Sequence, residues 1–142
     1  CAEDVQLYVA NVGDSRLYLS GHDINQVTED HSYVAAMMRA GELTEEQARN
    51  HPEKNVITRA IGVAWEVKAD FFEVDLKPGD KVMMCSDGLS NMIEDQRLYD
   101  VISSNSVEDS VRILIDEAKE NGGYDNITVI VIEPRIEEVN EC

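Results

Sequence analysis

The sequence has 142 residues, of which 43% are apolar, so it can fold as one domain with a core and is not a disordered chain. It carries 29 Asp and Glu against 12 Lys and Arg, and this formal charge of −17 disfavours binding to nucleic acid or to an anionic membrane. No apolar run reaches the roughly 18–20 residues of a membrane-spanning helix, and the N-terminus lacks the pattern of a signal peptide.

The chain has no initiator Met and enters strand-like sequence almost at once, so we expect it to begin inside a larger protein. Its cysteines are Cys1, Cys85 and Cys142, an odd number without clustered spacing, which argues against a disulfide framework or a zinc site. Cys85 ends an apolar run and is predicted to be a buried thiol. Cys1 and Cys142 could pair with each other or have been introduced artificially. A reducing, cytoplasmic location is the plain interpretation.

Three strands separated by Gly-Asp and Gly-His-Asp turns are predicted first, at 5–12, 16–19 and 24–28. A helical segment of about residues 30–55 follows, with one helix over 32–40 and a second that starts at a capping box on Thr44. We interpret this segment as a flap-like insertion. It should pack at the periphery, with Met37 and Met38 outside the main core.

The second half returns to strands and then to longer helices. Strands are predicted at 55–61, at 65–76 with a bulge at Phe71-Phe72, at 81–85 and at 127–132, and helices at 94–103 and 107–121. The run ITVIVI over 127–132 is continuously apolar, which predicts a central strand buried on both faces. Strands early and long helices late predict an α+β fold in which helices cover an antiparallel sheet.

Three aspartates stand beside Gly or Asn at breaks in these strands: Asp14, Asp87 and Asp125. Neighbouring strands lie about 4.8 Å apart, so two such carboxylates on adjacent strands can share one hard cation such as Mg²⁺ or Mn²⁺. Asp-Gly and Asp-Asn are also common turn formers, and each aspartate alone could serve a turn or a helix cap. The residues by themselves indicate an acidic metal-binding domain of mixed α and β structure.

The stretches VANVGDSRLYL, MMCSDGLSNMI and YDNITVIVI resemble, in order and spacing, the three C-terminal motifs of the PP2C-like, or PPM, protein phosphatases. The intervening segment from TEDHS to RAIG resembles the flap region of bacterial members, and the resemblance covers about residues 5–132. It implies an antiparallel β-sandwich flanked by helices, in the order α-β-β-α. Residues 1–142 would then be the C-terminal part of such a domain, incomplete at the N-terminal side, with the flap at about 30–55.

The resemblance implies hydrolysis of phosphoserine and phosphothreonine in proteins by water held between two Mn²⁺ or Mg²⁺ ions, with a third ion in bacterial members. Asp87 and Asp125 would bind one catalytic ion, Asp14 would match the acid that helps the third, and Asn126, beside Gly88 in a supporting role, would orient the Asp125 loop. We therefore predict that the Asp87 and Asp125 carboxylates lie within about 5 Å of each other. The implied partners are phosphorylated proteins and a cognate Ser/Thr kinase.

The sequence departs from the family in one respect. Family members carry, in an N-terminal segment, a phosphate-binding Arg, an acidic strand motif and an Asp-Gly-His-Gly motif that supplies the Asp bridging both ions. None of these is found here, Arg16 is a poor substitute, and His31 and His51 are expected to be structural or surface residues. We predict weak activity at most for this chain alone. The alternative is a truncated or split module that binds metal or a partner without turnover, associating through exposed sheet edges. An acidic Ca²⁺-binding protein is disfavoured because no EF-hand loop is present.

Overall fold

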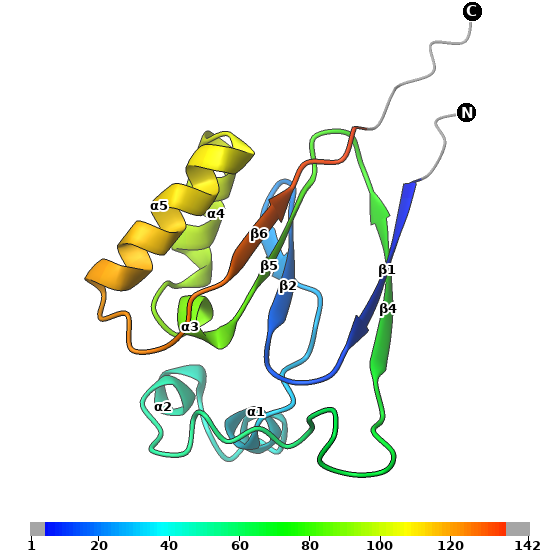
Figure 1. The fold of residues 1–142 in the computed structure, drawn as a ribbon, viewed down its shortest axis with the longest axis vertical. Helices are drawn as coiled ribbons and strands as arrows, with labels where there is room; N and C mark the ends of the chain where they lie inside the picture. Colours follow the sequence, from blue (N-terminus) through cyan, green and yellow to red (C-terminus); the bar gives the residue numbers. More distant parts are fainter. Residues whose placement is uncertain (1–4, 136–142) are drawn as a thin grey trace, which may run out of the picture.

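The computed structural model describes residues 5–135, and it confirms an α+β fold with two antiparallel sheets and a pair of long helices (Figure 1). The strands are β1 (Val5–Asn11), β2 (Arg16–Ser20), β3 (Ile24–Gln26), β4 (Asp70–Leu76), β5 (Lys81–Cys85) and β6 (Val129–Ile132). The helices are α1 (Tyr33–Arg39), α2 (Glu45–Arg49), α3 (Asp87–Ser90), α4 (Asp95–Ser104) and α5 (Val107–Glu120).

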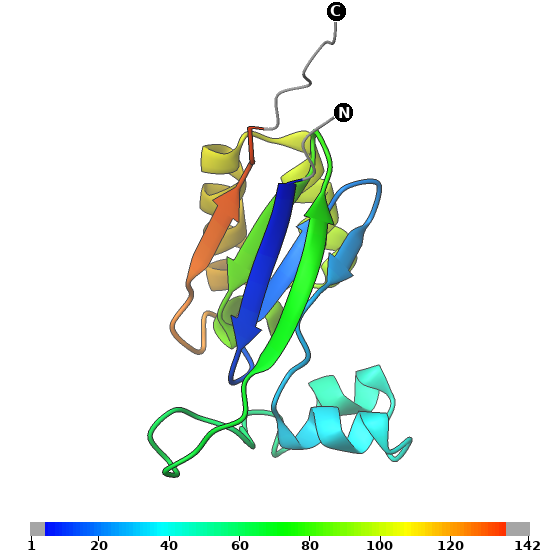
Figure 2. The same cartoon turned by 90° about the vertical axis from the view of Figure 1, so that its right-hand side faces the viewer.

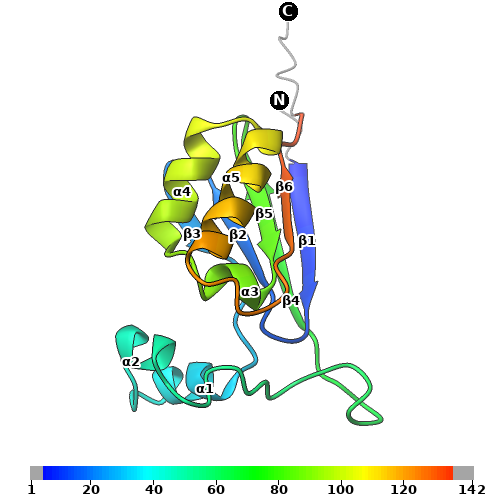
Figure 3. The same cartoon turned by 60° about the vertical axis from the view of Figure 1, so that its left-hand side comes forward.

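The larger sheet has the strand order β3-β2-β5-β6, and α4 and α5 cover one of its faces (Figures 1 and 3). Side chains from both layers meet in the main core, where Tyr18 and Met83 of the sheet pack with Leu98, Ile102 and Leu114 of the helices. The helix predicted at 107–121 is confirmed as α5, and one of its faces is apolar, since Leu114 and Ala118 are fully buried. The predicted buried Cys85 belongs to the same core.

A second sheet of β1 and β4 lies against the opposite face of the larger sheet (Figure 2). Its inner side chains alternate with outer ones, and Leu7 and Val74 pack on Leu17 and Val82 of the larger sheet. Three layers of the predicted α-β-β-α order are thus present in the part of the chain that the structure describes. The outer face of β1 and β4 exposes Tyr8 and Phe71.

The prediction that strand 127–132 is central is wrong for residues 5–135, because β6 forms the edge of the larger sheet. Val129 and Val131 pack against the helix-covered core as predicted. The alternate residues Ile130 and Ile132 face away from that core and are 47% and 43% exposed. The apolar run therefore correctly indicated two apolar faces, but only one of them is covered by the described residues.

The strand prediction at 55–61 is wrong, and the one at 65–76 is confirmed only from Asp70 to Leu76, as β4. Residues 55–61 and 65–69 form an exposed loop, and the segment's only β contact among the described residues is an isolated bridge between Ser32 and Ile57. No strand between residues 5 and 135 lies beside this loop to pair with it, and Trp65 is 105% exposed. The bulge at Phe71-Phe72 is also absent, since β1 and β4 pair without interruption from Val5 and Leu76 to Asn11 and Asp70.

The segment predicted to be a flap lies at one end of the sheets, and α1 and α2 stand apart from both cores (Figures 1 and 2). The Ser32 side chain caps α1, and the predicted capping box on Thr44 begins α2. Met37 and Met38 belong to neither core cluster, as expected. None of the helices between residues 5 and 135 is long and apolar enough to cross a membrane. Cys1 and Cys142 lie outside the described residues.

Candidate functional site

The three predicted aspartates lie at the same end of the larger sheet, Asp14 and Asp125 in loops and Asp87 as the first residue of α3. In the ladder, Arg16 is opposite Cys85, and Cys85 is opposite Val129. Asp14 comes shortly before the first of these residues, Asp87 shortly after the second and Asp125 shortly before the third. The strands that carry Asp87 and Asp125 are therefore neighbours, as predicted, although 38 positions separate the two residues.

Hydrogen bonds from the side chain and main chain of Ser86 join the start of α3, where Asp87 lies, to the Asp125 loop. The Ser86 hydroxyl donates to the Asn126 carbonyl at 3.1 Å and accepts from the Thr128 N–H at 3.0 Å. The Ser86 N–H donates to the Thr128 carbonyl at 3.1 Å, and the Asn126 N–H donates to the Asp125 carboxylate at 2.7 Å. Asn126 thus holds the Asp125 turn through its peptide groups.

Gly88 allows these turns to approach closely. A Cβ atom at this position would lie 2.3 Å from the Asn126 carbonyl oxygen and 3.5 Å from Cβ of Asp125. Because an approach of 2.3 Å is far inside van der Waals contact, no larger residue fits without moving the Asp125 turn. Gly88 therefore supports the site because its lack of a side chain leaves room for the Asn126 carbonyl.

Asp14 and Asp87 form a like-charge pair at the wall of a cleft of about 280 Å³ between the end of the larger sheet and the helices α1 and α2. Partial burial raises the pKa of Asp14, and repulsion from Asp87 raises it further. A bound cation would relieve this repulsion, so the pair is suited to a hard divalent ion. Asp125 and Gly88 line an adjoining cavity of about 190 Å³.

The ligand set within residues 5–135 is incomplete. No three His, Cys, Asp or Glu side chains in this range are grouped closely enough to hold a metal ion. Oxygen donors of the right chemistry for Mg²⁺ or Mn²⁺ are present in adjoining cavities, whereas a three-carboxylate cage is not. The separation of about 5 Å between the Asp87 and Asp125 carboxylates stays a prediction.

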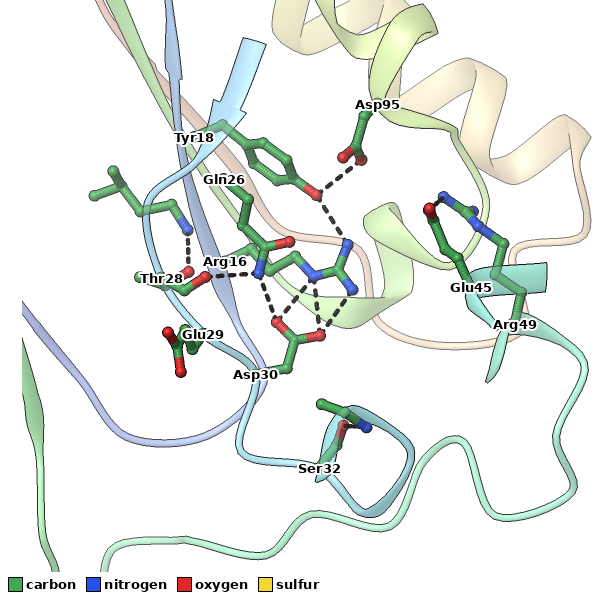
Figure 4. A network of polar contacts seen from close by, with 12 residues as sticks. Arg16, Tyr18, Gln26, Thr28, Glu29, Asp30, Ser32, Glu45, Arg49 and Asp95 are labelled. Carbon is green, nitrogen blue, oxygen red and sulfur yellow. Dashed lines mark hydrogen bonds and ion pairs between the residues drawn. The ribbon is translucent and has the colours of Figure 1, made fainter. Parts of the chain in front are cut away.

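Arg16 is anchored inside the cleft and not free to bind a phosphate (Figure 4). Its Nε and Nη2 donate to the Asp30 carboxylate at 2.7–3.1 Å, and its Nη1 donates to the Tyr18 hydroxyl at 2.9 Å. The Tyr18 hydroxyl donates in turn to Asp95 at 3.1 Å, and Gln26 donates to Asp30 at 2.9 Å. Burial opposes the charge of Arg16, but the Asp30 bonds outweigh it and leave the pKa raised.

The sequence interpretation missed this network and the environment of His31. Tyr18 and Asp95 are 77 positions apart, and His31 and Asp70 are 39 positions apart. Local patterns carry no information on such pairs, because the fold alone brings them together.

Burial raises the pKa of Cys85 to about 12, so this thiol is a packing residue and not a nucleophile.

Comparison with known proteins decides the family. The model for Stage II sporulation protein E (SpoIIE) matches residues 19–135, and the model for Protein phosphatase 2C matches residues 1–36. The chain belongs to the PP2C-like, or PPM, phosphatase family. It is 43% identical over 130 residues to the serine/threonine phosphatase stp of Listeria welshimeri, which is 90% of this chain and 52% of that protein.

Solved structures of PPM phosphatases agree with this fold. The serine/threonine phosphatase Stp1 of Staphylococcus aureus matches with a TM-score of 0.88 and 32% identity, covering 95% of this chain and 54% of that chain. The catalytic domain of the phosphatase PstP, solved with two manganese ions, matches with a TM-score of 0.81 and 32% identity, covering 92% and 54%. This chain therefore spans about half the length of the PPM phosphatases it matches.

Proposed function

We propose that this chain supplies part of the catalytic site of a metal-dependent phosphatase that removes phosphate from phosphoserine and phosphothreonine in proteins. The observation that carries the proposal is the placement of Asp14 and Asp87 in one cleft and of Asp125 in an adjoining cavity, at one end of the larger sheet. PPM relatives named serine/threonine phosphatases, one of them solved with two manganese ions, support the substrate class and the choice of Mn²⁺ or Mg²⁺.

Each aspartate has a distinct part in this proposal. Asp87, at the start of α3, and Asp125, in the neighbouring loop, would hold one catalytic ion, and Asp14 would help to hold a further ion. When bound, such ions lower the pKa of a water ligand and neutralise charge on phosphoryl oxygens. The bonds of Ser86 and the close packing at Gly88 hold the Asp125 loop against the start of α3.

The cleft between the end of the larger sheet and the helices α1 and α2 would receive the phosphorylated side chain, with residues 30–55 acting as a flap at its border. This assignment treats residues 5–135 as one part of a PPM domain with an insertion. Arg16 is held in the cleft by Tyr18 and Asp30. Because its guanidinium is engaged in this way, the proposal assigns the binding of phosphate to a residue outside this chain. The acidic surface favours protein over nucleic-acid substrates. The proposal also includes a cytoplasmic location and a cognate Ser/Thr kinase as a partner.

On its own, the 142-residue chain should turn over substrate very poorly even in millimolar Mn²⁺. Two cations a few ångströms apart repel each other, and a shared carboxylate normally offsets this repulsion. The alternative, a module that binds metal or a partner without turnover, is favoured by the incomplete ligand set and by the exposed side of β6. Adding the segment that carries the bridging carboxylate distinguishes the two, since only an enzyme would gain turnover.

The test is phosphatase activity on a phosphothreonine peptide, with and without a polypeptide carrying the Asp-Gly-His-Gly segment, in cis or in trans. We expect Mn²⁺-dependent turnover only in the combined protein. Asp87→Ala and Asp125→Asn should abolish it, whereas the exposed Asp116→Asn on α5 should not. Robust activity of the 142-residue chain alone that disappears with Asp87→Ala would refute the account of the incomplete site. No activity in the combined protein would favour the module.

A further inference from the structure

His31 is buried in the segment that joins β3 to α1, with 3% of its surface exposed. Both ring nitrogens are engaged. Nδ1 accepts a hydrogen bond from the Gly13 N–H at 3.1 Å, and Nε2 lies 2.6 Å from the carboxylate of Asp70. The main chain of His31 repeats the attachment, since its N–H donates to the Gly13 carbonyl at 2.9 Å and its carbonyl accepts from the Thr58 N–H at 2.7 Å.

These contacts select one form of the imidazole ring. A peptide N–H can only donate, so Nδ1 carries no proton, and the neutral ring must then carry its proton on Nε2. That proton points to Asp70, whose second oxygen accepts from Arg59 Nη1 at 3.0 Å. Arg59 Nη1 also lies 3.1 Å from Nε2, and because Nε2 carries the proton, Arg59 donates to the carboxylate and not to the ring. The Asp70 carboxylate thus orients the ring, and the ring presents an acceptor to Gly13.

His31 holds the main chain of Gly13, the residue next to Asp14. Gly13 has a φ of +116°, a conformation that only glycine adopts without strain, and its N–H and carbonyl are both bonded to His31. Without this attachment the turn could swing Asp14 away from the like charge of Asp87. We infer that His31, oriented by Asp70, is a positioning residue that holds the Asp14 carboxylate beside Asp87 for metal binding. This inference rests on the metal site of the proposed function.

The first test needs no metal. Long-range ¹H–¹⁵N spectra of the 142-residue chain should show His31 with its proton on Nε2 alone. The Gly13 amide should be protected from hydrogen exchange. Protection should survive in His31→Asn, which keeps an acceptor near the Nδ1 position, and disappear in His31→Gln, which keeps only a donor near Nε2. A proton on Nδ1, or protection that is equal in both variants, would overturn the inference.

The second test measures Mn²⁺ affinity by electron paramagnetic resonance on the same chain. We expect His31→Leu to weaken binding about tenfold and His31→Asn to restore most of the loss. The effect should vanish in an Asp14→Asn background, because His31 acts through Asp14. His51→Leu is the matched control, since Nδ1 of this second flap histidine also accepts a peptide N–H, from Glu53 at 3.1 Å. It should leave affinity unchanged.

The outcomes separate this inference from the proposed function. If Asp87→Ala does not weaken Mn²⁺ binding, the metal assignment fails and the positioning role fails with it. If Asp87→Ala abolishes binding while His31→Leu has no effect, or the same effect with and without Asp14, only the positioning role fails. If His31→Leu does not fold, His31→Asn and His31→Gln carry the test, and equal affinities in the two would overturn the inference.

Discussion

The two faces of the larger sheet differ in how completely they are covered. On the helix side, Met83 of β5 is 0% exposed and packs with α4 and α5. On the other side, the next residue, Met84, is 36% exposed, and it shares a cavity of about 350 Å³ with Ile130 and Val9 between the two sheets. Two methionines one position apart on the same strand thus occupy a closed and an open environment.

This difference shows that an alternating or continuous apolar pattern predicts apolar faces but not what covers them. The two-stranded sheet of β1 and β4 is narrower than the four-stranded sheet that it faces, so β6 extends beyond its cover. The chain spans about half the length of its PPM relatives, and an open apolar face of this kind is suited to contact with a further protein segment.

The largest expected effect tests the closed face against the open one. Met83→Ala should lower the free energy of unfolding by about 2–5 kcal/mol, because it leaves a cavity in a fully packed core. Met84→Ala is the matched control and should cost less than about 1 kcal/mol in the same urea titration. Equal losses would mean that the open face is closed in solution, for example by self-association.

The attachment of α4 to the closed face should have the next largest effect. Lys81 Nζ donates to the carbonyls of Ile102 at 3.0 Å and Asn105 at 2.8 Å at the C-terminal end of α4. Lys81→Met should cost about 1.5–3 kcal/mol of unfolding free energy, since charged hydrogen bonds to the helix end are lost. Lys77→Met, at an exposed position, should cost less than about 0.5 kcal/mol. A similar loss in both variants would exclude the capping role.

Gly88 tests the end of the sheet where the two aspartate turns meet. Gly88→Ala should cost about 1–3 kcal/mol, because the added methyl group meets a backbone carbonyl that cannot yield. Gly21→Ala is the control. There the added atom meets the Asp80 carboxylate at 2.7 Å, and a side chain can rotate away. A harmless Gly88→Ala, by thermal denaturation, would show that the Asp125 turn is more mobile than its contacts suggest.

The smallest effect concerns the anchoring of β4 at acidic pH. Hydrogen bonding to His31 and then to Arg59 lowers the pKa of Asp70 below its usual 3.8. A carboxyl pKa that is lower in the folded than in the unfolded state stabilises the fold at pH values above the usual pKa. This contribution is lost as the pH falls through the pKa of the folded state. The melting temperature of Asp70→Asn should therefore lie below that of the wild type at pH 6 and approach it below about pH 4. Asp116→Asn should show no such convergence.

The local sequence determined the helices and turns that are specified by capping residues, helical spacing or glycine within their own segment. The capping box on Thr44, the helical pattern over 107–121 and the Gly-Asp turns predicted helices and turns close to their observed positions. The local sequence also placed the three aspartates at strand ends, because a polar residue beside Gly or Asn at a break in an apolar run marks the point where a strand begins or ends. The PPM motifs then indicated the chemistry.

Tertiary structure alone decided the rest. Residues 55–69 have strand-forming composition but lack a neighbouring strand among the described residues, and backbone hydrogen bonding in a sheet needs such a partner. The same holds for the edge position of β6, the Arg16 network and the His31 attachment, which join positions up to 77 residues apart. Contacts of this kind depend on which surfaces the folded chain brings together, and no local pattern of residues encodes that.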